Sequence, residues 1–254
     1  MITKALVDHK NKLIMDWNEK AGCTVLVHMF FEHMGLIDEA LSYSKWIHDY
    51  RQQVFSKLNV VRYIDLEQLP YFKFKVVRNP YNRVVSSYLT IMRQIKERLP
   101  RVYNKNFEKN KLEIKRLLDV EDVDISFRQF VDYLSLVDIR NCDNHYEQQR
   151  KAYEDRVKWD KLCKLETIKN DLLEVNKKAG VQLRIADKTS VHHFRKNQNM
   201  KMNVSDIKWS NMKDNIPEYI HFYTPDLVYK VAEIYSEDFE AYQYSFENSF
   251  KLSS

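Results

Sequence analysis

The order of hydrophobic and polar residues along the chain predicts strands alternating with helices. Aromatic and β-branched residues dominate positions 72 to 77, as in a short buried strand. The apolar spacing then becomes helical over positions 84 to 92. Asn79 is a favourable helix N-cap, and Pro80 suits the first helical position because its missing N–H would have no partner there. The pattern therefore predicts a strand, a turn and a helix, with Arg78 at the carboxyl end of the strand, where open α/β sheets bind ligands.

Two side chains of this predicted unit suit the binding of a phosphate group. Ser86 lies about two turns into the helix, on the order of 10 Å beyond its start. A guanidinium fixed at the strand end, at Arg78, and a hydroxyl further along the helix could both hold one phosphate. The alternative interpretation is an ordinary strand, turn and helix with a solvated arginine.

A similar unit is predicted near the amino terminus. The apolar run over residues 12 to 17 predicts the first strand, and a helix of apolar spacing follows the next loop. Gly22, in this loop, is one of only three glycines, and glycine permits a positive φ and the close approach of a ligand. The N–H groups of residues 22 to 25 would bind an anion, aided by the charge of Lys20 and the hydroxyl of Thr24.

The remaining elements are mostly helical. One further strand is predicted over residues 161 to 165, and the helix after it ends at Gly180, a favourable C-cap. A late helix begins with Thr224 as its cap and Pro225 at its first position. Other helical patterns cover residues 38 to 58, as one or two helices, and residues 127 to 137.

Residues 98 to 123 differ from the rest because lysine and glutamate alternate there with few apolar residues. A solvated helix or an insertion is one interpretation of such a stretch. A lid, or a part of the groove that receives a substrate, is the other.

Composition narrows the classes of protein and of ligand. With 254 residues and 44% apolar content, the chain can bury a core, and one domain over residues 1–254 is expected. The net charge of +5 comes from 41 basic and 36 acidic residues, a smaller excess than a nucleic-acid-binding protein usually concentrates. We therefore expect no nucleic acid as partner. The balance fits a polyanionic cofactor, and equally an acidic or sulfated acceptor.

Cysteine usage and hydropathy exclude further classes. Cys23, Cys142 and Cys163 are too few and too scattered for a disulfide framework, and no pair has metal-ligand spacing. Cys163 falls in the predicted strand, where a buried thiol is expected. No run approaches the roughly 20 apolar residues that span a bilayer, and the first ten residues lack the apolar centre of a signal peptide.

Together, the two strand–loop–helix segments resemble the phosphosulfate-binding elements of sulfotransferases. The first reads K-A-G-C-T-V from Lys20, and the second reads R-N-P-Y-N-R-V-V-S-S-Y from Arg78. The resemblance implies that Arg78 and Ser86 hold the 3′-phosphate of 3′-phosphoadenosine-5′-phosphosulfate (PAPS). It also implies that the loop holds the 5′-phosphosulfate end, through Lys20, Ala21, Gly22, Cys23, Thr24 and Val25. The family usually has proline before the loop lysine, whereas this chain has Glu19, which puts the backbone shape of the loop in question.

Within that superfamily the chain is most similar to Golgi-type and bacterial carbohydrate sulfotransferases. The segments that carry this similarity are D-N-H-Y-E-Q-Q from Asp143, the stretch from Leu162 to Leu172, and the tail from Tyr223 to Ser245. Residues 193 to 197 resemble a late loop that covers the cofactor in the 2-O-sulfotransferases, where an arginine contacts the nucleotide phosphates. Arg195 would have that role here, and a basic surface loop is the equal alternative.

The resemblance implies a fold and a reaction. The fold would be a P-loop-NTPase-like three-layer α/β domain, with a central, mainly parallel sheet flanked by helices. The reaction would move a sulfuryl group from PAPS to a hydroxyl of a carbohydrate or another acceptor, with PAP as product and no metal. Lys20 would neutralise the leaving phosphate oxygen. His145 is the first choice for the base, because imidazole titrates near the working pH.

Several alternatives stay open at this point. Without the resemblance, a structural loop histidine bonded to the backbone is the favoured interpretation of His145. His28 and His33 compete for the role of base, although helix packing explains them more simply. A small-molecule kinase of P-loop type would need a Mg²⁺-binding Ser/Thr after a Gly-Lys pair and a strand-end Asp, and neither occurs in the expected place. A catalytically inactive nucleotide-binding module is the other rival. We expect a cytoplasmic protein, or one of the Golgi lumen if the chain is the truncated part of an anchored enzyme.

Overall fold

The computed structural model describes residues 3–97, 105–185 and 201–245, which divide into two compact units. The first unit comprises Met1–Arg78 and Lys151–His192, and the second comprises Asn79–Arg150 and His193–Ser254. Each unit has its own cluster of buried apolar side chains. The expectation of one domain over residues 1–254 stays a prediction.

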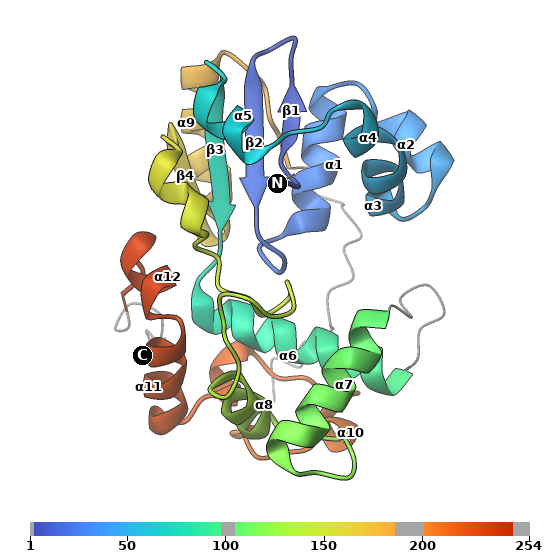
Figure 1. Ribbon diagram of the computed structural model, residues 1–254, viewed down its shortest axis with the longest axis vertical. Coiled ribbons are helices and arrows are strands. Elements are labelled where there is room, and N and C mark those ends of the chain that lie inside the picture. The colour runs from blue at the N-terminus through green and yellow to red at the C-terminus, as the bar shows by residue number, and fades with distance from the viewer. Residues whose placement is uncertain (1–2, 98–104, 186–200, 246–254) are drawn as a thin grey trace. The chain divides into compact units, whose positions relative to one another are not determined.

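The first unit is built on a four-stranded sheet, as expected for an α/β fold (Figure 1). Its spatial order is β1 (Leu6–Asp8), β2 (Leu13–Trp17), β3 (Phe72–Val77) and β4 (Lys161–Lys164). The pairs β2–β3 and β3–β4 are parallel, whereas β1 pairs antiparallel with β2. The predicted mainly parallel sheet flanked by helices is confirmed.

The run over residues 12 to 17 forms the second strand rather than the first. β1 precedes it and forms a hairpin with it, in which Leu6 lies opposite Met15. The turn is held by Asp8, whose Oδ1 accepts hydrogen bonds from the N–H groups of Lys10 (3.0 Å) and Asn11 (3.1 Å). β1 has only three residues, too few for a repeating pattern of apolar positions to show.

Alternate strand residues point to opposite faces of the sheet, and each face has its own cover. On one face, side chains such as Met15 and Phe74 pack with helix α1 (Cys23–His33) and helix α9 (Ile168–Ala179). On the other face, Ile14 packs with helix α5 (Tyr63–Gln68) through Leu66. The sheet therefore lies between two layers of packed side chains.

Several short helical segments complete the first unit. The stretch predicted as one or two helices is divided into four, and 3₁₀ turns lie on either side of β4. Ring contacts of Phe31 with Tyr50 and Phe55 join two of the four segments to α1. The segments are α2 (Ile37–Tyr43), α3 (Ile47–Tyr50), the π-helical turn Arg51–Phe55, α4 (Ser56–Leu58), and the 3₁₀ turns Ala152–Arg156 and Leu165–Thr167.

The described part of the second unit is helical and contains an aromatic core. Tyr88 makes ring contacts with Phe127, Phe130, Trp209 and Phe222. The elements are α6 (Pro80–Glu97), α7 (Lys105–Leu118), α8 (Phe127–Leu134), α10 (Trp209–Met212), the 3₁₀ turn Tyr219–Phe222, α11 (Pro225–Ile234) and α12 (Ser236–Ala241).

The cap predicted for α6 is confirmed, and the cap predicted for α11 is confirmed in position only. The side-chain oxygen of Asn79 accepts a hydrogen bond from the N–H of Tyr81 at 3.0 Å. Thr224 precedes α11, but its side chain makes no capping bond to the helix. Arg128 donates to the Thr224 hydroxyl at 3.1 Å instead, so a side chain from α8 occupies it.

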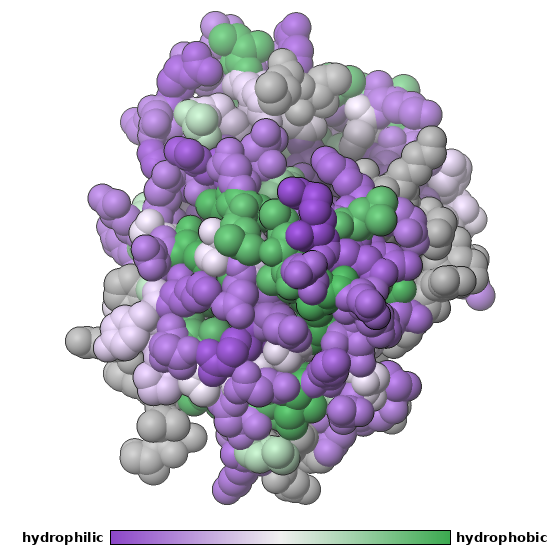
Figure 2. Space-filling view, turned by 60° about the horizontal axis from the view of Figure 1, so that its bottom comes forward, coloured by the Kyte–Doolittle hydropathy of each residue, from purple (hydrophilic) through white to green (hydrophobic). Residues whose placement is uncertain are grey.

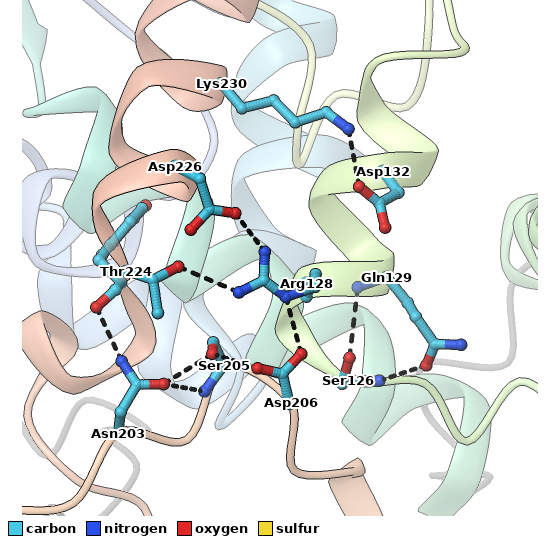
Figure 3. A network of polar contacts seen from close by, with 11 residues as sticks. Ser126, Arg128, Gln129, Asp132, Asn203, Ser205, Asp206, Thr224, Asp226 and Lys230 are labelled. Atoms are coloured by element: carbon cyan, nitrogen blue, oxygen red, sulfur yellow. Dashed lines mark hydrogen bonds and ion pairs between the residues drawn. The ribbon is translucent and has the colours of Figure 1, made fainter.

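Arg128 joins three segments of the second unit (Figure 3). Its Nε donates to Asp206 at 2.7 Å, and its guanidinium forms an ion pair with Asp226 at the start of α11. Together with the bond to Thr224, these contacts connect α8, the segment around Asp206 and α11. One planar guanidinium has five N–H donors, which is why a single residue can make all three connections.

The charge-rich stretch contains α7, and the helix is not wholly solvated. Ile114 is fully buried in the core of the second unit, whereas Leu112 is 64% exposed. Residues 98–104 lie outside the described part of the chain. None of the described helices is both long and apolar enough to cross a membrane. Hydrophilic residues dominate the face in Figure 2, with apolar patches between them.

Candidate active site

The loop between β2 and α1 is shaped by two residues with positive φ. Gly22, the N-cap of α1, has φ 84°, and Lys20 has φ 68°. A Cβ atom added to Gly22 would lie 2.7 Å from Cδ1 of Leu165. The close approach that glycine permits here is therefore that of a side chain of this protein, which the sequence-based interpretation had attributed to a ligand.

The predicted anion-binding residues lie at the start of α1. The N–H of Leu26 donates to the carbonyl oxygen of Gly22 at 3.1 Å, which begins the helix there. First-turn N–H groups such as those of Cys23, Thr24 and Val25 have no acceptor within their own helix. Ala21 differs, because its N–H donates to the Asn18 carbonyl at 3.1 Å and its side chain is fully buried. Ala21 thus supports the shape of the loop.

Arg78 connects the two sequence segments that suggested the site. Its Nη1 donates to the main-chain carbonyl oxygen of Lys20 at 2.9 Å. This bond joins the carboxyl end of β3 to the left-handed residue of the loop, within the first unit. The structure therefore brings Lys20 and Arg78 together, 58 positions apart in the chain.

Glu19 takes the place of the proline that the family usually has before the loop lysine. It forms an ion pair with Lys4, which lies before β1. A carboxylate beside an anion-binding loop would repel the ligand, and the lysine compensates its charge.

His48, which the sequence pattern did not single out, contacts the loop. Its Nε2 lies 3.2 Å from the hydroxyl oxygen of Thr24. His48 is 8% exposed, and burial, with the nearby charge of Arg51, lowers its pKa from 6.5 to about 4. The imidazole is therefore neutral near pH 7, able to exchange a hydrogen bond with Thr24 without adding charge.

Arg51 was also missed by the sequence reasoning. Its guanidinium lies over the ring of Trp17, 5.6 Å from the centroid. Its Nε is buried and has no hydrogen-bond partner among the described residues. Burial lowers the pKa of Arg51, and Glu19 and Cys23 act in the opposite direction. Arg51 belongs to the π-helical turn, a type of segment often found at functional sites, but such a turn leaves no mark in a sequence.

In the second unit, His145 lies in a loop whose main chain is held by neighbouring helices. The Ser87 hydroxyl of α6 bonds to the carbonyl oxygen of His145. Arg83 of the same helix donates to the carbonyl oxygen of Asn144 at 3.3 Å, and the Tyr235 hydroxyl donates to that of Tyr146 at 2.5 Å. The loop is therefore fixed on both sides of the histidine.

The side chain of His145 forms a pair with Asp143. Nδ1 of the imidazole lies 2.7 Å from Oδ1 of the carboxylate, which also accepts the His145 main-chain N–H at 2.9 Å. Burial alone would raise the pKa of Asp143, but the hydrogen bonds and charge of His145 and a bond from Asn110 hold it below its ordinary value. An ionised Asp143 favours the tautomer with the proton on Nδ1, which leaves Nε2 as an acceptor.

The other predicted residues are placed as follows. Ser86 is half-buried on α6, where Asn82, Ser86 and Thr90 share one face at four-residue spacing. His33, the last residue of α1, lies 3.3 Å from Asp8 and so contacts the β1–β2 hairpin, in agreement with a structural role. Arg195 lies outside the described residues.

His28 and Cys163 complete the set of predicted positions. His28 is half-buried on α1, and burial lowers its pKa. Cys163 is fully buried in β4, as predicted, and burial raises the pKa of its thiol to about 12. Across residues 3–97, 105–185 and 201–245, no three His, Cys, Asp or Glu side chains form a group that could hold a metal ion.

Comparison with known proteins gives one match. No curated protein and no solved structure matches the chain. The profile of the sulfotransferase family matches residues 3–245, which include the loop between β2 and α1, the Arg78 segment and the Asp143–His145 pair. The chain therefore belongs to the sulfotransferase family.

Proposed function

We propose that the protein transfers a sulfuryl group from PAPS to a hydroxyl of a carbohydrate acceptor. Membership of the family supports sulfuryl transfer, and the donor and the acceptor are the proposed parts. The observation that carries the proposal is the bond between the Arg78 guanidinium and the Lys20 carbonyl. It joins the arginine at the end of β3 to a helix N-terminus, where anionic groups bind.

The loop is assigned to the 5′-phosphosulfate end of the donor. The N–H groups of Gly22 to Val25 and the Thr24 hydroxyl would hold its oxygens, and Lys20 would neutralise the charge that develops on the leaving phosphate oxygen. Arg78, Ser86 and Arg195 are assigned to the 3′-phosphate. The bond to Lys20 is made by Nη1 of Arg78 and holds the guanidinium at the end of β3.

The reaction is an in-line displacement at sulfur, related to phosphoryl transfer. The acceptor oxygen forms a new O–S bond while the S–O bond to the phosphate breaks, and PAP leaves with the electron pair. The proton of the acceptor hydroxyl passes to Nε2 of His145. Asp143, bonded to Nδ1, stabilises the imidazolium that results. We assign charge neutralisation at the leaving group to Lys20 and main-chain N–H groups, the role that Mg²⁺ has in kinases.

Thermal denaturation with nucleotides tests the donor assignment. PAP is expected to raise the melting temperature, and AMP, which lacks the 3′-phosphate, to raise it far less, because a ligand that binds only the folded state stabilises it. Arg78→Met should remove most of the difference between the two nucleotides. Arg62→Met is the matched control, since its side chain is 62% exposed in the same unit and pairs only locally with Asp65.

Two results would contradict the donor assignment. Equal shifts with PAP and AMP would remove the 3′-phosphate roles of Arg78 and Ser86. A larger shift with ATP and Mg²⁺ than with PAP would favour a kinase. Binding of PAP without sulfation of any hydroxyl acceptor would instead indicate an inactive binding module.

A further inference from the structure

Asn110, in the charge-rich stretch, contacts the carboxylate that pairs with His145. It lies on α7, is 4% exposed, and donates from Nδ2 to Oδ2 of Asp143 at 2.9 Å. The opposite oxygen, Oδ1, accepts from the ring and main chain of His145. Each oxygen of Asp143 thus has its own donor, which restricts rotation of the carboxylate about its χ2 angle.

The orientation of the Asn110 amide follows from its neighbours. Its Oδ1 accepts from the Tyr146 hydroxyl at 3.3 Å, on the side away from Asp143. The reverse orientation would place the amide oxygen against a carboxylate, two acceptors without a proton between them. The NH₂ group therefore faces Asp143, and this contact is a charge-assisted hydrogen bond.

Beyond Tyr146, the contacts lead back to α7 at Glu113, about one turn from Asn110. The Tyr146 and Tyr133 hydroxyls lie 2.8 Å apart, and Tyr133 donates to Glu113 at 2.8 Å. These three contacts, from Glu113 to Asn110, share only two hydroxyl protons. With the Tyr133 proton on Glu113, the single Tyr146 proton is shared between Oδ1 of Asn110 at 3.3 Å and the Tyr133 oxygen at 2.8 Å. The bond from Asn110 to Asp143 needs neither proton, so it is the firm contact of Asn110.

We propose that Asn110 is a positioning residue for the base, holding the Asp143 carboxylate so that His145 keeps its proton on Nδ1 and its acceptor on Nε2. The effect on catalysis rests on the proposed function, whereas the effect on the His145 tautomer rests only on the contacts of Asn110, Asp143 and His145. It gives α7 a role that its charge pattern did not suggest. Helix α7 supports the site. The sequence alone had allowed four interpretations of this stretch: a solvated helix, an insertion, a lid or part of an acceptor groove.

Among the described residues, charged and titratable groups approach the pair from four helices and from the loop itself, and Tyr235 bonds to the loop main chain at Tyr146. Helix α6 contributes Arg83, which bonds to the loop main chain beside His145. Helix α7 contributes Glu113. Helix α8 contributes Tyr133, whose hydroxyl donates to Glu113. The loop itself holds Cys142, Tyr146 and Glu147. Beyond them, Asp238 of α12 accepts the main-chain N–H groups of Gln149 and Arg150 at 2.9 and 2.8 Å.

The test replaces Asn110 by leucine, which has a similar size and no donor. In the ¹⁵N NMR spectrum of the full chain, wild-type His145 should show one ring nitrogen protonated, Nδ1. Asn110→Leu should show averaging between the two tautomers. With PAPS and unsulfated chondroitin as the acceptor probe, kcat should fall about tenfold to a hundredfold, part of what a general base contributes, and KM for PAPS should stay unchanged. Lys111→Met, next to Asn110 but outside the network, should change neither measurement.

A second variant keeps the test decisive if leucine is not tolerated. Asn110→Asp has the shape of asparagine, and its carboxyl can donate to Asp143 only while it holds a proton. Two adjacent carboxyls raise the pKa of one of them. The variant should therefore lose activity as the pH rises through that pKa, which gives a descending limb that wild type lacks. A role in packing alone would not produce this limb.

The outcomes separate this inference from the proposed function. An unchanged His145 tautomer in Asn110→Leu, or the absence of the descending limb in Asn110→Asp, would overturn the inference. Wild-type kcat in His145→Ala would overturn the assignment of the base. In that case the NMR result would still decide whether Asn110 orients the pair. A tautomer change with loss of kcat in Asn110→Leu and not in Lys111→Met would support both.

Discussion

Gly22 and Lys20 show the backbone conformation that the loop between β2 and α1 requires. Both have positive φ, which glycine adopts without the steric conflict that a Cβ atom brings. The scarcity of glycine made Gly22 recognisable in the sequence. The physical reason for a glycine there could not be recognised, because a Cβ atom would meet the side chain of Leu165, 143 positions later in the chain. A single sequence shows that such a residue is a glycine, but it does not show which side chains lie next to it in the fold.

We expect Gly22→Ala to destabilise the protein by about 1 kcal/mol more than Gly35→Ala. Gly35 also has positive φ (70°), but a Cβ atom there would meet nothing within 4 Å. Backbone strain is thus common to both variants, and crowding against Leu165 adds to the first. The free energy of unfolding from urea denaturation measures the difference.

The double variant Gly22→Ala/Leu165→Ala provides the control. Removing the leucine should relieve the crowding, so the two substitutions together should cost less than the sum of their separate effects. Additive effects would show that the contact with Leu165 does not limit position 22.

At the scale of elements, local chemistry was readable and long-range pairing was not. The unit formed by β3 and α6 was predicted because Asn79 and Pro80 mark a helix start by themselves, and Asn79 indeed bonds to the N–H of Tyr81. The π-helical turn over Arg51–Phe55 differs from an α-helix by one residue in its hydrogen bonding, and side-chain spacing does not distinguish the two. The contact between Asn110 and Asp143 depends on the packing of α7, to which the charge pattern gives no guide.

Strand β3 illustrates the same limit on one element. Its F-K-F-K order shows alternation but not which face is solvated. Lys75 is fully buried and forms an ion pair with Glu154 of the turn Ala152–Arg156. On the neighbouring strand, Asp16 accepts a hydrogen bond from Tyr153 at 3.0 Å. Burial raises the pKa of Asp16, against the charge of Lys75. Both faces of β3 are therefore interior.

We expect Lys75→Met to lower the free energy of unfolding by about 3 kcal/mol, because it leaves buried carboxyl groups without their cation. Lys178→Met, on the exposed side of α9, should leave it nearly unchanged. Adding Glu154→Gln to Lys75→Met should recover part of the loss, since it removes one of the unpaired charges. Urea denaturation at pH 7 measures all three. No recovery in the double variant would contradict an ion pair with Glu154.

For the whole molecule, the family match and the candidate residues extend over both units. Residues 3–245 match one family, although the chain passes from the first unit to the second between Arg78 and Asn79. The alternation of strands and helices followed from elements read one at a time, whereas the three-layer fold and the site followed from the resemblance of two short segments. His48 and Arg51 could not be found in that way, since neither belongs to a segment with a recognisable pattern.

Protein stability as a whole should depend on the titration of His48. Its folded-state pKa of about 4 lies below the ordinary 6.5, so the unfolded chain binds a proton first as the pH falls. This stabilising contribution is present above pH 6.5 and is lost as the pH falls toward 4, by up to about 3 kcal/mol. His48→Gln should make the decline in the free energy of unfolding between pH 7 and 4.5 shallower.

The matched substitution is His9→Gln, at an exposed histidine that contacts Tyr71. It should leave the pH dependence as in wild type. An equally steep decline in His48→Gln would show that other groups account for the loss of stability in acid.

The left-handed conformation of Lys20 has a consequence for how the protein can change. A residue with a Cβ atom gives up about 1 kcal/mol in that conformation, and a glycine there would not. Lys20→Gly is thus expected to raise the free energy of unfolding and to lower the rate of the proposed sulfuryl transfer. Stability and the role proposed for the Lys20 ammonium therefore make opposite demands on this position.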